Sequence, residues 1–173
     1  GLGSTVGTTP IISVDENKDV AIPDGGLTIT TSDNTTQITL TSTDADANSG
    51  PALDYYRNSG SPADSDYIGT TRYIGRNDNS QDVSFVAINV QANDVSDGTE
   101  DGTYIINTMR AGALDQTFNI TPTEVIINED SKDVDFRVES NGNTHMLFVD
   151  GGDNRVGIGT APDLGVGLHI RSV

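Results

Sequence analysis

Apolar and polar residues alternate along much of this chain, and this period of two is the feature that most constrains its fold. Residues 37–41 read Gln-Ile-Thr-Leu-Thr and residues 134–139 read Val-Asp-Phe-Arg-Val-Glu. In an extended chain this spacing places apolar side chains on one face and polar side chains on the other. Helical periodicity does not recur. The pattern predicts an all-β protein built from one-sided strands.

Further strands are expected where short apolar or β-branched runs lie between turn clusters. The predicted strands cover residues 27–31, 37–41, 53–57, 71–74, 83–91, 104–110, 116–121, 125–127, 134–139, 145–150 and 168–171. Residues 83–90 are apolar on both faces in places, which predicts a central strand of a β-sandwich. Clusters of Gly, Asn and Asp between the runs supply the positive φ angles that tight turns need.

The apolar content is low for a chain that must build a core. Only 34% of the residues are hydrophobic and 5% are aromatic, and Trp is absent. A globular domain usually has roughly 45–50% apolar residues. Either neighbouring copies of the chain or an extensive set of backbone hydrogen bonds in sheets must therefore complete the fold, and the two are compatible.

The charge and the missing residue types exclude several classes of function. A formal net charge of −17 repels nucleic-acid phosphates and anionic lipids, so no nucleic-acid partner and no membrane insertion are expected. The absence of Cys excludes disulfides and thiolate metal sites. The chain has no apolar run long enough to span a bilayer. Because it begins with Gly1, it is expected to be a piece of a longer polypeptide.

Two segments of the chain echo each other. Residues 14–29 and residues 149–170 both read V-D, an acidic turn, a basic residue, V-x-I, P-D and then G-L-x-I. Such an echo predicts one structural element placed on both sides of a larger insert. The alternative is chance similarity between two short hairpins rich in Gly and Asp.

The C-terminal part resembles segments of bacteriophage tail fibres and related virion fibres. The resemblance rests on residues 134–150 and on the run V-G-I-G-T-A-P at 156–162, followed by L-H-I at 168–170. The middle of the chain resembles a recurrent tail-fibre module through G-P-A-L-D-Y-Y-R-N-S-G-S-P-A-D at 50–64 and through 97–102. These matches cover about two thirds of the chain and lie in the expected order.

The resemblance implies a homotrimeric fibre that forms a stalk or host-contact part of a virion. Its partners would be other copies of itself, other virion proteins, and a glycan or protein of the bacterial surface. The expected organisation is a shaft-like N-terminal segment over 1–49, a β-sandwich module over 50–127 and a shaft-like C-terminal segment over 128–173. No enzymatic activity and no cofactor are expected.

A thin C-terminal meander buries too little surface to be stable alone and leaves sheet edges open, which also favours association. The residues expected to pack between the chains are Val134, Phe136, Val138, Val156, Ile158, Leu168 and Ile170. Gly157 and Gly159 alternate with Val156 and Ile158, which suits close approach of backbones.

Host contact is expected from two turn-rich loops, presented in three copies so that weak contacts add. The predicted receptor-contact residues are Asn58, Ser61, Asp64, Tyr67, Asp97, Glu100 and Asp101. Asp94, Asp97, Glu100 and Asp101 also form the best candidate for a pair of glycosidase carboxylates. Turn chemistry is the preferred interpretation of these carboxylates, because Gly residues lie on both sides.

Metal binding has only weak candidates. Asp44 and Asp46 lie in a loop with oxygen ligands at alternate positions, although the spacing excludes an EF-hand. His145 and His169 could each form a ring of three imidazoles about a threefold axis, although a packed strand residue is the simpler interpretation. No metal site is predicted.

Three other functions remain open at this point. The chain could belong to a fibre or tailspike that degrades polysaccharide, with its catalytic residues outside this segment. It could be a bacterial surface adhesin. It could also be a structural spacer without receptor contact, which the sequence does not distinguish from an adhesive segment.

Overall fold

The computed structural model describes residues 13–14, 20–22, 25–162 and 167–170 of the chain. Strands and irregular segments make up these ranges, which contain no helix. The all-β prediction is therefore confirmed for the described part of the chain. The chain divides into two units, Gly1–Leu53 and Asp54–Val173.

The described residues of the first unit contain little regular structure. Strand β1 (Ser13–Val14) pairs with β2 (Val20–Ala21) in an antiparallel arrangement. Residues 25–50 run without strand pairing, so the predicted strands at 27–31 and 37–41 are wrong. Their apolar side chains, such as Ile38 at 63% exposure, lie in solvent. Alternation alone cannot form a strand when no partner strand is hydrogen-bonded to it.

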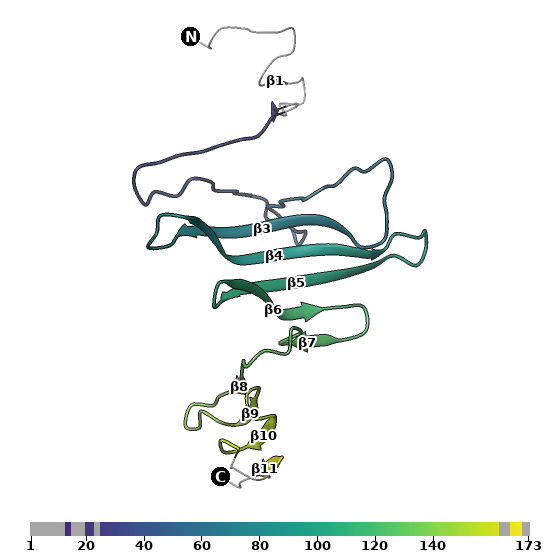
Figure 1. Cartoon of the computed structure of the whole chain (residues 1–173). Coiled ribbons are helices and arrows are strands. Elements are labelled where there is room, and N and C mark those ends of the chain that lie inside the picture. The colour runs from purple at the N-terminus through teal and green to yellow at the C-terminus, as the bar shows by residue number, and fades with distance from the viewer. Residues whose placement is uncertain (1–12, 15–19, 23–24, 163–166, 171–173) are drawn as a thin grey trace. The chain divides into compact units, whose positions relative to one another are not determined.

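The second unit contains an antiparallel sheet whose five strands follow chain order (Figure 1). The strands are β3 (Asp66–Arg76), β4 (Asp82–Asp94), β5 (Asp101–Arg110), β6 (Ala113–Ile120) and β7 (Val125–Ile127). They contain all or nearly all of the predicted strands at 71–74, 83–91, 104–110, 116–121 and 125–127. The predicted strand at 53–57 is wrong, because this segment has no strand pairing.

The register gives this sheet two chemically different faces, because paired residues point to the same side. We call one the tyrosine face. It consists of the cross-strand rows Gly69–Val90–Tyr104–Ile120–Val125 and Thr71–Ile88–Ile106–Phe118–Ile127, and of the shorter row Tyr73–Val86–Thr108–Asp115. The opposite face, which we call the polar face, is richer in amides and hydroxyls. It includes Thr70, Asn89, Gln91, Thr103, Asn107 and Asn119.

Side chains of the polar face bond to each other and to the sheet. Thr70 donates to the side-chain oxygen of Asn89 at 2.9 Å, and Asn107 donates through its amide to the carbonyl of Ala87 at 3.2 Å. The side chains of the tyrosine face expose mainly hydrocarbon. A sandwich over 50–127 would place a second sheet on one of these faces. Among the described residues of the second unit, the strands of the other sheet are not stacked on this one.

The second sheet of this unit has four strands in the order β11-β10-β9-β8. They are β8 (Phe136–Val138), β9 (Leu147–Asp150), β10 (Arg155–Ile158) and β11 (Leu168–Ile170). Strands β10 and β11 are parallel, and the other neighbours are antiparallel. The hairpin β9–β10 and the pair β1–β2 occupy corresponding positions in the sequence echo. In the rest of the N-terminal copy, residues 15–19 and 23–24 lie outside the described residues, and residues 25–29 have no strand pairing, whereas their counterpart at 168–170 forms β11.

The glycines of the C-terminal motif are required by close backbone contacts. A Cβ atom at Gly157 would overlap the carbonyl oxygen of Thr160, because the chain after β10 folds back over this position. Gly159 has a φ of +75°, which a side chain would strain. Its carbonyl accepts a hydrogen bond from the Asn143 amide at 3.1 Å. The V-G-I-G-T run thus encodes a tight reversal that leads from β10 towards β11.

A compact corner connects the two sheets. The carboxylate of Asp130 accepts a hydrogen bond from the backbone N–H of Gln116 at 2.7 Å. Asn128 bonds both the N–H and the carbonyl of Lys132, at 2.9 and 2.7 Å. Asp115, which is nearly buried, lies 2.8 Å from Arg110 and 3.9 Å from Lys132. Side-chain bonds therefore hold the segment after β7 against β6.

Burial is shallow throughout the described residues. No side chain among them is fully buried, and the buried apolar residues are Ala87 and Ile105. Many large apolar side chains are exposed, including Tyr73 at 58% and Ile170 at 64%. A single chain therefore folds into sheets without enclosing a conventional core.

The close contact at Gly157 gives a direct test of the C-terminal fold. We expect Gly157→Ala to destabilise the four-stranded sheet by roughly 1–3 kcal/mol, because the backbone at Thr160 must move. The matched control is Gly142→Ala, since nothing lies within 4 Å of a Cβ added there. Thermal unfolding followed by circular dichroism measures both. Equal melting temperatures for the two variants would contradict the fold-back at Gly157.

Candidate functional site

The two loops predicted to contact a receptor lie at the same end of the five-stranded sheet. Strand β3 begins, β4 ends and β5 begins at this end. The carboxylate of Asp64 accepts a hydrogen bond from the backbone N–H of Val95 at 3.0 Å, which joins the two loops directly. Gln91 adds a bond from its side-chain amide to the carbonyl of Ser65 at 2.8 Å. We call residues 58–65 and 95–100 the loop cluster.

The predicted receptor-contact residues are all exposed in or beside this cluster. They are Asn58, Ser61, Asp64, Tyr67, Asp97, Glu100 and Asp101. Tyr67 is 51% exposed and lies on β3, next to the cluster. Arg57 holds the segment before β3 in place. Its guanidinium donates a hydrogen bond of 2.8 Å to the carbonyl of Tyr67 and forms an ion pair of 3.1 Å with Asp66.

Two carboxylates in or next to the loop cluster, those of Asp94 and Glu100, accept hydrogen bonds from the backbone of the turn after β4. Asp94 accepts a hydrogen bond from the N–H of Ser96 at 2.7 Å, and Glu100 accepts one from the N–H of Gly98 at 3.1 Å. The bond from the Ser96 backbone, followed by bonds from the Ser96 and Thr99 hydroxyls, lowers the pKa of Asp94 below its ordinary value. A general acid needs the opposite shift. Asp94 is therefore suited to fixing the turn.

The four-stranded sheet collects six of the seven predicted packing residues on one face. Its cross-strand rows are Phe136–Val149–Val156–Leu168 and Val138–Leu147–Ile158–Ile170. All eight side chains are apolar, and we call this surface the C-terminal apolar face. Val134, the seventh predicted residue, precedes β8 and is not part of a strand.

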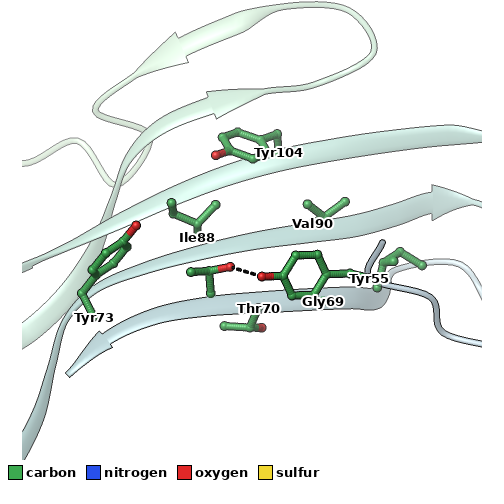
Figure 2. Close-up of a pocket in the computed structure, with 9 residues that line it drawn as sticks. Tyr55, Gly69, Thr70, Tyr73, Ile88, Val90 and Tyr104 are labelled. Carbon is green, nitrogen blue, oxygen red and sulfur yellow. Dashed lines mark hydrogen bonds between the residues drawn. The ribbon is translucent and has the colours of Figure 1, made fainter. Parts of the chain in front are cut away.

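The tyrosine face contains a hollow that the sequence did not predict. The hollow has a volume of about 410 Å³ and lies over β3, β4 and β5. Tyr55, Tyr73 and Tyr104 stand around it, above Ile88 and Val90 (Figure 2). The hydroxyl groups of Tyr55 and Thr71 are 3.2 Å apart and hydrogen-bonded. The register that gathers these residues depends on bulges, and no local pattern marks those in advance.

Most of the weak candidates for metal ligands form local hydrogen bonds or packing contacts. Asp44 and Asp46 accept hydrogen bonds from the backbone two residues ahead, at 3.2 and 2.8 Å. His145 lies 2.9 Å from the Thr144 hydroxyl and packs edge-on against Phe148. His169 is half-buried, and its Nδ1 has no hydrogen-bond partner among the residues that the structure describes. Within the described ranges, no group of three or more His, Asp or Glu residues is arranged to hold a metal ion.

In the part of the chain that the structure describes, no helix could cross a membrane. Comparison of the chain with models of protein families, with curated proteins and with solved structures gives no match. The two apolar faces and the loop cluster are therefore the features of the structure that bear on function.

The lowered pKa of Asp94 predicts how the loop cluster responds to acid. The folded-state pKa lies below the ordinary value of 3.8. The Asp94 carboxylate is therefore ionised and accepts the hydrogen bond from Ser96 at pH values above 3.8. The bond is lost as the pH falls through the folded-state pKa of Asp94, which lies below 3.8. A carboxyl-carbon NMR titration should give a midpoint for Asp94 below 3.8, with faster exchange of the Ser96 amide hydrogen below that midpoint. A midpoint at or above 3.8 would contradict the bonded turn.

Proposed function

We propose that this chain is a structural and adhesive segment of a bacteriophage tail fibre or another virion fibre, and that it helps contact the bacterial host surface. In this proposal it is not an enzyme. The observation that carries the proposal is that both sheets of the second unit leave an apolar face exposed. A chain with two exposed apolar faces would bury most of this apolar surface by associating with copies of itself.

The C-terminal apolar face supports the association directly. Leu168 is 57% exposed, Ile170 is 64% exposed and Ile158 is 40% exposed, all on one side of the sheet. In a homotrimer these rows would face a common axis and lose contact with water. The number three comes from the resemblance of 134–162 to virion fibres. The sandwich predicted for 50–127 requires a second sheet from outside the unit.

The loop cluster supports the adhesive part of the proposal. Its exposed acidic, amide and phenol groups are held by the Asp64–Val95 bond and the turn at Asp94. Rigid loops at the end of a sheet are suited to recognition, and three copies add their contacts. The partner would be a glycan or protein of the bacterial surface. The location would be the virion.

Association is tested by the mass of the purified segment in solution. We expect light scattering to give the mass of three chains over a wide range of protein concentration, because the exposed apolar faces favour the assembled state. Ile158→Glu on the C-terminal apolar face should weaken the assembly, since it places a charge among apolar side chains. The control is Arg137→Glu, at an exposed position of β8 that projects to the other face. A monomeric wild type would contradict the trimer.

Adhesion is tested separately on the loop cluster. Asp97→Ala removes an exposed side chain from the turn between β4 and β5. Asp78→Ala makes the same change in the turn at the opposite end of the sheet. If the cluster contacts the host, binding of the labelled trimer to host cells should fall at least several-fold for Asp97→Ala combined with Tyr67→Ala, and remain unchanged for Asp78→Ala. Full binding by the combined variant would favour a spacer without receptor contact at these residues.

A further inference from the structure

We propose that Asn141 is a site of spontaneous covalent modification, at which the side-chain amide is lost and aspartate and isoaspartate form, and that the isoaspartate product loosens the reversal at Gly159. Asn141 lies in the loop between β8 and β9 and is followed by Gly142. No other Asn in the sequence precedes a glycine. The inference does not rest on the proposed function, because it follows from the chemistry of this loop alone.

The reaction requires only water as a co-reactant. The backbone nitrogen of Gly142 attacks the side-chain carbonyl carbon of Asn141. A C–N bond forms, and the side-chain amide leaves as ammonia with the proton of that nitrogen, which closes a five-membered succinimide ring. Water then opens the ring at one of its two carbonyl carbons. Opening at the side-chain carbonyl gives aspartate, and opening at the main-chain carbonyl gives isoaspartate, in which the main chain passes through the former side chain.

The structure leaves the two reacting groups open to each other. Asn141 and Gly142 are both exposed. The Gly142 N–H and the Asn141 side chain form no hydrogen bond with the residues that the structure describes, because the loop is closed on either side of them by bonds between Ser140 and Asn143. Nothing lies within 4 Å of a Cβ atom added at Gly142. Glycine therefore leaves the nitrogen accessible and the backbone free to rotate.

The Asp-Gly pairs at 97–98, 101–102 and 150–151 could close the same ring, but the fold restrains them. The glycine N–H of the pair 97–98 donates to the Glu100 carboxylate at 3.1 Å. The glycine N–H of the pair 150–151 donates to the Asp135 carboxylate at 3.0 Å. The pair 101–102 lies in β5, which is paired with β4. Ring closure in these pairs would first require local opening of the structure.

The isoaspartate product would disturb the reversal after β10. It adds one methylene carbon to the main chain, two residues before Asn143. The Asn143 amide donates to the Gly159 carbonyl at 3.1 Å, and its side-chain oxygen accepts a hydrogen bond from the His145 N–H at 2.8 Å. Both bonds depend on the position of Asn143, so a longer main chain would displace them. The aspartate product keeps the main-chain length and should leave both bonds in place.

Peptide mapping of the aged protein tests the modification. The purified chain is incubated at mildly alkaline pH and digested with trypsin, which releases residues 138–155 as one peptide. Loss of the amide adds one mass unit, and labelling by an isoaspartyl methyltransferase identifies isoaspartate. We expect Asn141 to convert at least tenfold faster than any other Asn of the chain. Conversion of another Asn at the same rate would overturn the inference.

Gly142→Ala is the matched variant for this experiment. The added Cβ atom should slow conversion of Asn141 at least tenfold, because it obstructs the attacking nitrogen. It should leave the melting temperature unchanged, since nothing lies close to it. An unchanged rate in Gly142→Ala would show that the amide is lost without attack by this nitrogen, which would overturn the proposed reaction.

Denaturation distinguishes the effect of the fold from that of the dipeptide. In concentrated urea, isoaspartate formation in the pairs 97–98 and 150–151 should accelerate at least several-fold, because their glycine N–H groups are released. The rate at Asn141 should stay nearly the same, since the folded loop does not restrain it. Strong acceleration at Asn141 would show that the fold protects this site, and the inference would be overturned.

The effect on the reversal is tested against Asn141→Asp, which supplies the aspartate product alone. In the aged protein, the isoaspartate fraction should exchange the His145 amide hydrogen at least several-fold faster than Asn141→Asp does, as measured by NMR. Equal exchange would show that the loop absorbs the longer main chain, which would overturn the proposed effect at Gly159. Because these experiments measure neither association nor host binding, their failure would leave the proposed function in place.

Discussion

A β-sheet one layer thick can satisfy its backbone hydrogen bonds completely and still leave both faces in water. This constraint governs the second unit of the chain. Strands β3 to β7 pair in a continuous antiparallel meander, yet the described residues supply no second layer over them. Hydrogen bonding thus determines the secondary structure. Hydrophobic burial, which normally dominates the stability of a domain, is left for contacts outside the single chain.

The distribution of side chains between the two faces of the five-stranded sheet indicates how the chain tolerates the lack of a second layer. On the polar face, amides and hydroxyls such as those of Asn107 and Thr70 bond to the sheet itself. On the tyrosine face, Tyr55 bonds Thr71 and lies close to Gly69, while many of the apolar side chains stay exposed. The polar face also holds the two buried apolar residues, Ala87 and Ile105, and the buried Thr103 hydroxyl on this face has no hydrogen-bond partner among the described residues. A sheet with one mainly polar face and one mainly apolar face behaves as half of a sandwich. In the four-stranded sheet, six of the predicted packing residues likewise share one apolar side.

The sequence was informative where its alternation was supported by neighbouring turns. Strand positions between residues 71 and 127 were predicted well, since the glycine-containing turns at 98 and 112 define hairpins that pair adjacent runs. The runs at 27–31 and 37–41 have the same alternation but no adjacent partner, so the prediction failed there. The tyrosine-lined hollow could not be predicted, because bulges at Ile68 and Phe85 shift the register and decide which residues align.

The corner at residues 128–132 has a consequence for how the segment would carry mechanical load. A short strand such as β7 would peel away one hydrogen bond at a time if it were pulled from the edge of the sheet. Behind it, however, Asp130 holds the backbone of β6, Asn128 bonds Lys132 through two atoms, and Lys132 lies near Asp115. Tension arriving from β8 would meet these bonds together before it reached β7. The corner would therefore share an applied force across several bonds at this joint.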